Sequence, residues 1–438
     1  MRQTLASLFA LFVATLTLTL GSGYLSTFLS LKMKTLEAPD WLVGIVMSGY
    51  YLGLVLGARL CHRVLQRVGH IRAFAVFAAL NSAIVLAHGI FVIPMLWFPL
   101  RVLTGISMMG LFMVVESWLN ERSPREFRAR VFSFYMIMQY VGSGAGQYLL
   151  NIGAITEPVH FFVIGMLFAL CLLPVSLTRT MHPAPIEAVS FNWSRIYKTA
   201  PFGLLGVLVS GVINGSFYGL APIYARTQGL DLSQVANFMA ATIVGGLLLQ
   251  YPVGMLSDRF ERRLMLALLF FATGSLSALL AIGGADAVWL MYLSAALFGG
   301  AAFTIYPVAV AHTHDHFDAS KVVVVSAALL VVYGLGATIG PLLASVAMWL
   351  LGARGLFLFV ATVALLFSLV ALLNRRVEPE AVAAQEPFVA VPPSTSPVIN
   401  TLDPRAGEEQ ATVLEEEDLE AAEEENEEED NESEPPRE

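Results

Sequence analysis

The chain has 438 residues, of which 56 % are apolar and only 13 % are charged. Ordinary globular proteins carry about 25 % charged residues, so this composition excludes a typical soluble protein, and its two cysteines exclude a disulfide-rich secreted one. The net charge of −9 combines two unlike parts. Residues 375–438 carry 21 acidic and 4 basic side chains, whereas residues 1–374 carry 13 acidic and 21 basic ones. The chain is therefore a cationic, apolar body followed by a polyanionic tail.

Twelve apolar stretches are long enough to cross a bilayer, whose core requires roughly 20 residues of helix. Because backbone polar groups must be satisfied inside lipid, we expect each stretch to be a helix. In chain order the stretches cover residues 4–31, 41–64, 71–92, 94–119, 130–152, 158–177, 201–224, 233–256, 264–283, 287–312, 322–351 and 354–374. The predicted fold is an all-α membrane protein with twelve transmembrane helices.

Lys and Arg lie mainly on one side of the predicted membrane. The two terminal segments and the loops on their side hold 20 of the 25, whereas the opposite side holds only Lys32, Lys34, Arg226 and Arg354. Cytoplasmic loops of membrane proteins carry an excess of Lys and Arg. We therefore expect a multi-pass protein of the bacterial inner membrane with both termini in the cytoplasm.

The two halves of the body resemble each other at an offset of 192 residues, which pairs Arg67 with Arg259, Gly142 with Gly334 and Gly144 with Gly336. Six helices repeated in the same orientation predict two parallel bundles with a site near the midplane between them. We accordingly divide the chain into an N-terminal six-helix bundle (1–177), a cytoplasmic linker (178–200), a C-terminal six-helix bundle (201–374) and a disordered acidic cytoplasmic tail (375–438).

The loops that follow the second helix of each half carry a recognisable motif. The second copy contains Gly254, Leu256, Asp258, Arg259, Arg262 and Arg263, with Glu261 in place of a glycine. The first copy keeps Arg67, Gly69 and Arg72 but has Gln66 in place of the acid. This pattern resembles the G-x-L-x-D-R-x-G-R-R loop of the major facilitator superfamily. The resemblance implies that these residues bias one conformation over another; the alternative is that the basic residues only orient the protein in the membrane.

A second family motif, R-x-x-x-G, matches Arg101 and Gly105 in the fourth predicted helix. An arginine within a membrane span is costly and usually faces a cavity or a partner, although it can also extend toward the interface. The segment VESWLNER from Val115 to Arg122 is similar to the YcaD-like branch of the superfamily. Within it, Glu116 is expected to pair with a loop arginine (Arg63, Arg67 or Arg128) and to act in gating, with a proton site as the alternative.

Small residues recur in the fifth and eleventh predicted helices. They are Gly142, Gly144, Gly334, Gly336 and Gly340, followed by Pro341. Because small residues let transmembrane backbones approach closely, we expect these positions to serve helix packing. The fifth helix lacks the proline of the glycine–proline signature of proton antiporters, which argues against drug–proton antiport.

In the superfamily, helices 1, 4, 7 and 10 usually line the substrate cavity. The resemblance therefore points to Arg101, Asn214, Tyr218 and Tyr306 as cavity candidates, although a tyrosine or an amide among packed helices can equally be a core group. One buried cation with almost no acid near the midplane suits an anionic or neutral amphipathic substrate. Because arginine keeps its proton, coupling to a proton gradient and facilitated diffusion both stay open.

Other chemistry receives little support from the sequence. His312, His314 and His316, with Asp315 and Asp318, are explained by a hydrated loop, because a closed metal site needs about four ligands at fixed geometry. We expect no metal, no cofactor and no enzymatic activity. The predicted function is transmembrane transport of a small organic solute by alternating access, by a monomer embedded in the lipid bilayer and without a nucleic-acid partner. The alternative is a receptor or scaffold that has lost transport and acts through its acidic tail.

Overall fold

The computed structural model describes residues 2–123, 127–177, 193–283, 287–317 and 321–375, together with Phe388, Thr395 and Ser396 of the tail. The described body is helical throughout, which confirms the predicted fold class. Its elements are α1 (Arg2–Thr35), α2 (Asp40–Val68), α3 (His70–Ile90), α4 (Pro94–Arg122), α5 (Arg128–Gly146), η2 (Gln147–Ile152), α6 (Val159–Leu170), α7 (Leu172–Ser176), α8 (Trp193–Thr199), α9 (Pro201–Thr227), α10 (Leu232–Ser257), α11 (Arg262–Ile282), α12 (Val288–His314), α13 (Val322–Leu351) and α14 (Gly355–Arg375).

Eleven spans among the described residues are long and apolar enough to cross a membrane. The fifth predicted stretch, 130–152, is not among these spans; it forms α5 and η2, and α5 carries Arg128 and Arg130 in its first turn and Gln139 in its middle. The sixth stretch is divided into α6 and α7 near Pro174. Because proline has no N–H to bond the carbonyl four residues earlier, the helix is interrupted after Leu170.

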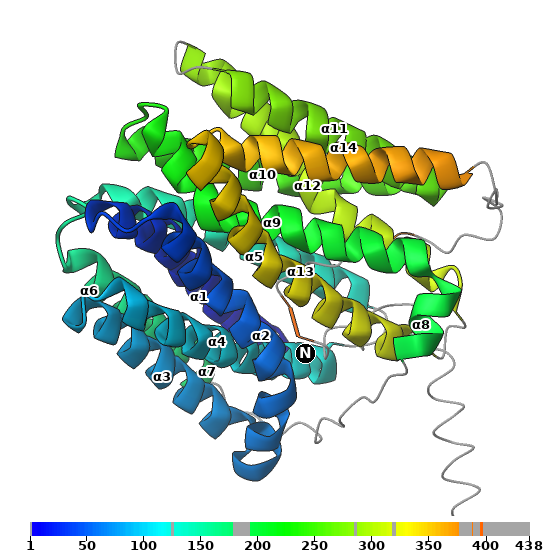
Figure 1. The fold of residues 1–438 in the computed structure, drawn as a ribbon. Coiled ribbons are helices and arrows are strands. Elements are labelled where there is room, and N and C mark those ends of the chain that lie inside the picture. The colour runs from blue at the N-terminus through cyan, green and yellow to red at the C-terminus, as the bar shows by residue number, and fades with distance from the viewer. Residues whose placement is uncertain are drawn as a thin grey trace, which may run out of the picture.

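The helices form two bundles, here called the N-bundle (α1–α7) and the C-bundle (α9–α14). Figure 1 shows the blue and cyan helices of the N-bundle on one side and the green to orange helices of the C-bundle on the other. The bundles meet where α1 and α2 pack on α9, α2 packs on α13, and α5 packs on α10. We call the end where α1 begins and α14 ends the terminal end, and the opposite end the far end.

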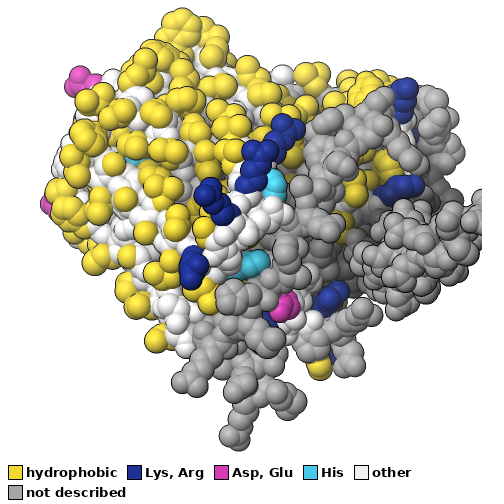
Figure 2. Space-filling view, turned by 90° about the horizontal axis from the view of Figure 1, so that it is seen from below, with side chains coloured by type: hydrophobic (Ala, Val, Ile, Leu, Met, Phe, Trp, Pro, Cys, Tyr) yellow, Lys and Arg dark blue, Asp and Glu magenta, His cyan; other side chains and the backbone are white. Residues whose placement is uncertain are grey.

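The outer surface of the bundles is apolar. Figure 2 shows one face on which hydrophobic side chains cover a broad area, while Lys and Arg gather along one border of it. Large exposed apolar side chains include Leu248, Ile282, Trp289, Trp349 and Leu366, all more than half exposed. An apolar surface of this extent is what a lipid-facing helix bundle requires.

The structure distinguishes the predicted packing glycines. A side chain on Gly142 would lie 2.6 Å from the Leu16 carbonyl oxygen of α1, and one on Gly340 would lie 2.9 Å from Ser216 of α9. Gly336 likewise lies directly on the α9 backbone at Leu208. These three positions require glycine because neighbouring helices approach too closely for a Cβ. Gly144 has only an ordinary contact, 3.6 Å from Ile243.

Two further predicted packing residues lie where the bundles meet. A side chain on Gly334 of α13 would press on the side chain of Val55 in α2, so the close contact there is with a side chain and not with backbone. Pro341 lies within α13, and its carbonyl oxygen would be 2.6 Å from a Cβ on Gly44 at the start of α2. The α2–α13 contact is therefore tightest toward the far end.

Candidate functional site

A cavity of about 100 Å³ lies between the two bundles, with hydroxyl and amide groups in a largely apolar wall. The N-bundle supplies residues of α1, α2, α4 and α5 to its wall, and the C-bundle supplies Asn214, Tyr218 and Phe303 from α9 and α12. A water-sized site needs about 10–15 Å³ by the same measure, so the cavity holds several waters or one part of a small solute. The bundles must therefore separate further before a whole organic solute can enter.

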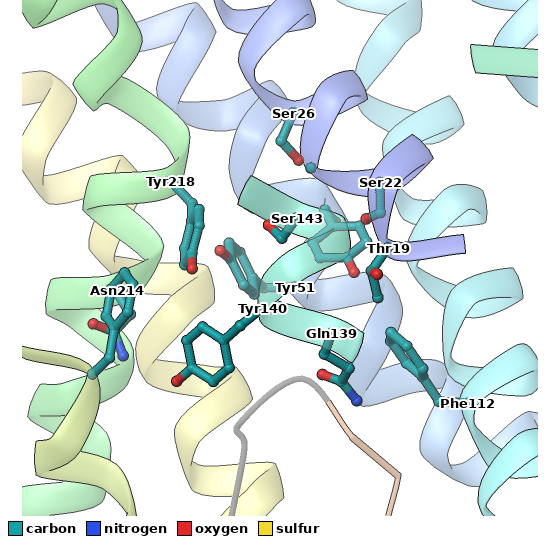
Figure 3. A pocket seen from close by; sticks show the side chains of 13 residues that line it. Thr19, Ser22, Ser26, Tyr51, Phe112, Gln139, Tyr140, Ser143, Asn214 and Tyr218 are labelled. Atoms are coloured by element: carbon teal, nitrogen blue, oxygen red, sulfur yellow. The ribbon is translucent and has the colours of Figure 1, made fainter. Parts of the chain in front are cut away.

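Tyrosines and small hydroxyl side chains dominate the cavity. Figure 3 shows Tyr51 of α2, Tyr140 of α5 and Tyr218 of α9 with their hydroxyl groups directed into the space between the helices. The Tyr218 ring stacks on Phe303, with ring centroids 5.4 Å apart and planes 15° apart. The cavity thus combines aromatic faces with hydroxyl donors and acceptors, which suits a partly planar, polar solute.

Arg101 lies just behind the cavity wall. Its side chain is buried, donates to the Ser26 hydroxyl over 3.3 Å, and places its guanidinium carbon 4.8 Å from the centre of the Tyr50 ring. Ser26 and Tyr50 both line the cavity. Among the described residues no carboxylate forms an ion pair with Arg101. A buried cation balanced only by a hydroxyl and an aromatic face gives the cavity a positive potential.

Two amide side chains in the cavity wall retain hydrogen-bonding capacity. The buried Asn214 amide makes no hydrogen bond of ordinary geometry, although the Tyr333 hydroxyl is close enough to interact with it. The Nε2 atom of Gln139 in α5 also has no hydrogen-bond partner. Because an unsatisfied buried amide is costly, groups of this kind favour a bound water or a polar ligand atom.

The four residues predicted from the sequence to line the cavity have different positions in the structure. Asn214 and Tyr218 line the cavity, and Arg101 contacts it through two lining residues. Tyr306 of α12 is not in the wall; it is buried against Tyr333 of α13, with ring centroids 5.0 Å apart.

The sequence analysis missed the face of α1 that lines the cavity. Thr19, Ser22 and Ser26 all reach it, and with Thr15 and Ser30 they form a stripe at helical spacing. Small hydroxyl residues are weak signals one by one, but their repetition every three or four residues marks one helix face. That periodicity is the sequence feature from which this face of α1 could have been predicted.

The second loop motif forms a buried ionic cluster within the C-bundle. The Arg262 side chain at the start of α11 is fully buried and pairs with Asp315 after α12. It also donates to the Ala311 carbonyl over 3.2 Å and lies 3.3 Å from Asp258. The cluster therefore holds the ends of α10, α11 and α12 together. Arg263 stacks its guanidinium over the ring of Phe202, 5.2 Å from the ring centre.

The other loop-motif residues have more open surroundings. Arg259 is exposed, as are Arg67 and Arg72 of the first copy. Gly69 is the sole residue between α2 and α3 and has φ of 78°, a backbone conformation that favours glycine. The second copy thus builds an ion-pair cluster, while in the first copy the glycine turn has a clear structural role.

Glu116 of α4 does not have the arginine partner that the sequence suggested. Its side chain is fully buried near the terminal end, where one carboxylate oxygen accepts a hydrogen bond from the Tyr135 hydroxyl over 2.6 Å. The other oxygen accepts bonds from the backbone N–H and the hydroxyl of Ser396 in the tail. Arg63 and Arg67, which we expected as partners, are exposed. Arg128, the third expected partner, forms no ion pair with Glu116 among the described residues.

Histidines near the end of α12 form hydrogen bonds with neighbouring residues of the protein. His314 shares a hydrogen bond with Ser326 over 2.9 Å, and His316 bonds to the His312 carbonyl over 2.8 Å. Asp318 lies outside the described residues. In the described part of the chain, no three His, Cys, Asp or Glu side chains are grouped in a way that could hold a metal ion.

Sequence comparison decides the family. The family model described as Major Facilitator Superfamily matches residues 11–246 and again residues 203–406. The chain belongs to the major facilitator superfamily. It is 31 % identical over 374 residues to the uncharacterized MFS-type transporter YcaD of Salmonella arizonae, covering 84 % of this chain and 96 % of that protein. The YcaD protein of Salmonella newport matches with the same identity and coverage.

Solved structures of the superfamily share this fold. A variant of the nucleoside transporter NupG has a TM-score of 0.75 at 13 % identity, covering 84 % of this chain and 99 % of its own. A bacterial homologue of the human lysosomal transporter Spinster has a TM-score of 0.69 at 14 % identity, covering 88 % and 98 %. The superfamily member described here is thus a multi-pass membrane transporter by family, with the two-bundle fold of its structural neighbours.

Proposed function

We propose that this protein carries a small organic solute across the bacterial inner membrane by alternating access, and that the cavity between the bundles is its binding site. The observation that supports this most directly is the cavity's position, with lining residues from both bundles and unsatisfied amide groups in its wall. A site shared by two bundles is broken when they rock apart, so binding and conformational change are coupled.

The cavity chemistry favours a neutral or anionic solute with a planar part. The described lining residues include tyrosines, serines, amides and two phenylalanines, with no Asp or Glu among them, and Arg101 lies immediately behind. Aromatic faces would hold the planar part, and the amides and hydroxyls would bond its polar edge. Because an organic cation would face Arg101 without a compensating carboxylate, it would be disfavoured.

The orientation of the protein follows the distribution of its basic residues. We assign the terminal end to the cytoplasm, because 20 of the 25 Lys and Arg lie in the terminal segments and the loops on that side. The far end would then face the periplasm. A protease or an impermeant reagent applied to each side of the membrane tests this assignment directly.

Flux into proteoliposomes tests the function. The panel should contain organic anions, neutral polar aromatic solutes including nucleosides, and organic cations, each measured with and without a proton gradient. We expect uptake of at least one anionic or neutral solute and none of the cations; the effect of the gradient decides proton coupling. Uptake restricted to organic cations would contradict the proposed substrate class. No flux for any solute, together with a protein bound by the tail, would favour the receptor alternative.

Two matched tyrosine variants test the site itself. Tyr218→Phe removes a hydroxyl from the cavity, whereas Tyr306→Phe removes a buried hydroxyl outside its wall. A lost hydrogen bond of about 1 kcal/mol corresponds to roughly a fivefold weaker affinity, so we expect KM to rise about fivefold for Tyr218→Phe only. Equal effects of the two variants would show that the cavity is not the binding site.

A further inference from the structure

Three residues of the acidic tail lie against the transporter body. Thr395 and Ser396 are 2 % and 0 % exposed, although they lie some 20 residues beyond the end of α14. Figure 1 shows this short orange stretch among the helices of the bundles. The prediction of a disordered tail therefore does not describe these residues; most of the remaining tail lies outside the described residues.

The first anchor of the tail is Glu116 in the N-bundle. The Ser396 backbone N–H donates to Glu116 Oε2 over 2.9 Å, and the Ser396 hydroxyl donates to the same oxygen. Together with the Tyr135 hydroxyl, these are the three hydrogen bonds of a fully buried carboxylate. Because a buried carboxylate is costly without donors, the tail satisfies a group that the bundle leaves incompletely bonded.

The residue before this anchor lies between the two bundles. Thr395 lines a small cavity of about 30 Å³ together with Met109 of α4 and Leu330 and Tyr333 of α13. Tyr51 belongs both to this cavity and to the central one. The tail therefore occupies the space next to the central cavity on its terminal side.

The second anchor of the tail is the loop motif of the C-bundle. The Phe388 N–H donates to Asp258 Oδ1 over 2.8 Å. The Phe388 ring covers Gly254, close enough that a Cβ there would collide with it. Both groups that receive the tail, Glu116 and Asp258, are acidic residues near the terminal end, and each belongs to a different bundle.

We propose that the terminal mouth of this transporter is a binding site for the tail segment that carries Phe388, Thr395 and Ser396; these three residues contact both bundles and obstruct access to the central cavity. The inference rests on the proposed function only in taking that cavity as the transport site. The segment binds through hydrogen bonds to two carboxylates and through one aromatic ring. These contacts are reversible, so the tail acts as a built-in inhibitor that must leave before the mouth opens.

Reagent access to the cavity tests the proposal without relying on transport. A Gln139→Cys variant places a thiol in the cavity wall, and the two natural cysteines are buried and give a low background. Its reaction rate with a hydrophilic maleimide is measured in nanodiscs, in the full chain and with a second substitution. Ser396→Asp places a negative charge against Glu116, whereas Thr401→Asp adds the same charge five residues further along the chain.

We expect Ser396→Asp to raise the labelling rate of Gln139→Cys about tenfold or more, because it replaces a charge-assisted hydrogen bond by repulsion. Thr401→Asp should leave the rate unchanged. A second pair guards against misfolding: a chain lacking residues 385–438 should show the fast rate, and a chain lacking residues 401–438 the slow one. Equal rates in the members of both pairs would overturn the proposal.

Flux measured on the tail variants and the truncated chains, each with Gln139 retained, separates this proposal from the proposed function. Faster labelling with no transport of any solute would refute transport while supporting the tail as an obstruction. Normal transport with equal labelling rates in both pairs would refute the obstruction and leave transport standing.

Discussion

The two ends of the interface between the bundles are closed in different ways. At the far end the bundles contact each other directly: the Ser30 hydroxyl of α1 donates to the Gly219 carbonyl of α9 over 2.8 Å, and Gly44 of α2 lies against Pro341 and Ser345 of α13. At the terminal end, residues of the tail lie between α4 and α13. One closure belongs to the bundles themselves, whereas the other depends on a segment that can detach.

This difference has a physical consequence for the transport cycle. Helix backbones in direct contact, as at Gly44 and Pro341, separate only when whole bundles move. A tail held by a few polar contacts exchanges with water without any change in the bundles. Opening of the far end therefore depends on movement of the bundles alone, whereas opening of the terminal end also depends on whether the tail is bound. Variants at each end should therefore have distinct effects.

Disruption of the buried ionic cluster at the terminal end should have the largest effect on stability. Arg262→Gln removes the buried cation that pairs with Asp315, whose side chain is only 10 % exposed. Removing one partner of a buried ion pair costs about 3–5 kcal/mol of unfolding free energy. We expect a large loss of thermal stability in detergent, measured by unfolding monitored with a thiol dye or by circular dichroism. Arg72→Gln, at an exposed residue of the first motif copy, is the control and should be nearly neutral.

The direct contact at the far end should be sensitive to added volume. Gly44→Val places a side chain against Ser345 and Pro341, and overpacking of this kind costs about 1–3 kcal/mol. We expect the far end to open, so that a thiol in the cavity becomes reactive from the far side while flux falls. Gly144→Val, next to an ordinary contact with Ile243, is the matched control. Far-side reactivity as low as in the parent protein would show that this contact does not hold the far end closed.

Removal of a single hydrogen bond at the far end should have the smallest effect on access to the cavity. Ser30→Ala removes the bond to the Gly219 carbonyl, which is worth about 1 kcal/mol and shifts a two-state equilibrium roughly fivefold. We expect a modest rise in far-side reactivity of a cavity thiol with full retention of folding. Ser48→Ala, whose hydroxyl bonds only within its own helix at Ile45, should not change the reactivity. A larger effect at Ser48 than at Ser30 would contradict the assignment of the far-end contact.

Sequence reasoning succeeded where the relevant physics is local. Most predicted helices follow from apolar residues over a length that matches the bilayer, with small shifts in their boundaries, as from 4–31 to Arg2–Thr35. The fifth and sixth stretches are each divided into two elements. The loop motif could also be predicted, because its residues are near one another in the chain, and the repeat could be predicted because similar local patterns recur 192 residues later. The prediction of the cavity residues was less complete. Asn214 and Tyr218 line the cavity, but Tyr306 faces α13, since the rotation of α12 about its axis is set by packing.

The sequence by itself determined that this chain lies in a membrane as two six-helix repeats, because hydropathy and helical length act on each segment separately. Only the tertiary structure decided which helix faces enclose the cavity, which acid pairs with Arg262, and that Glu116 bonds to Tyr135 and Ser396. Those outcomes depend on contacts between residues as far apart as 116 and 396. No local pattern encodes such contacts, because their energy exists only once the bundles and the tail have come together.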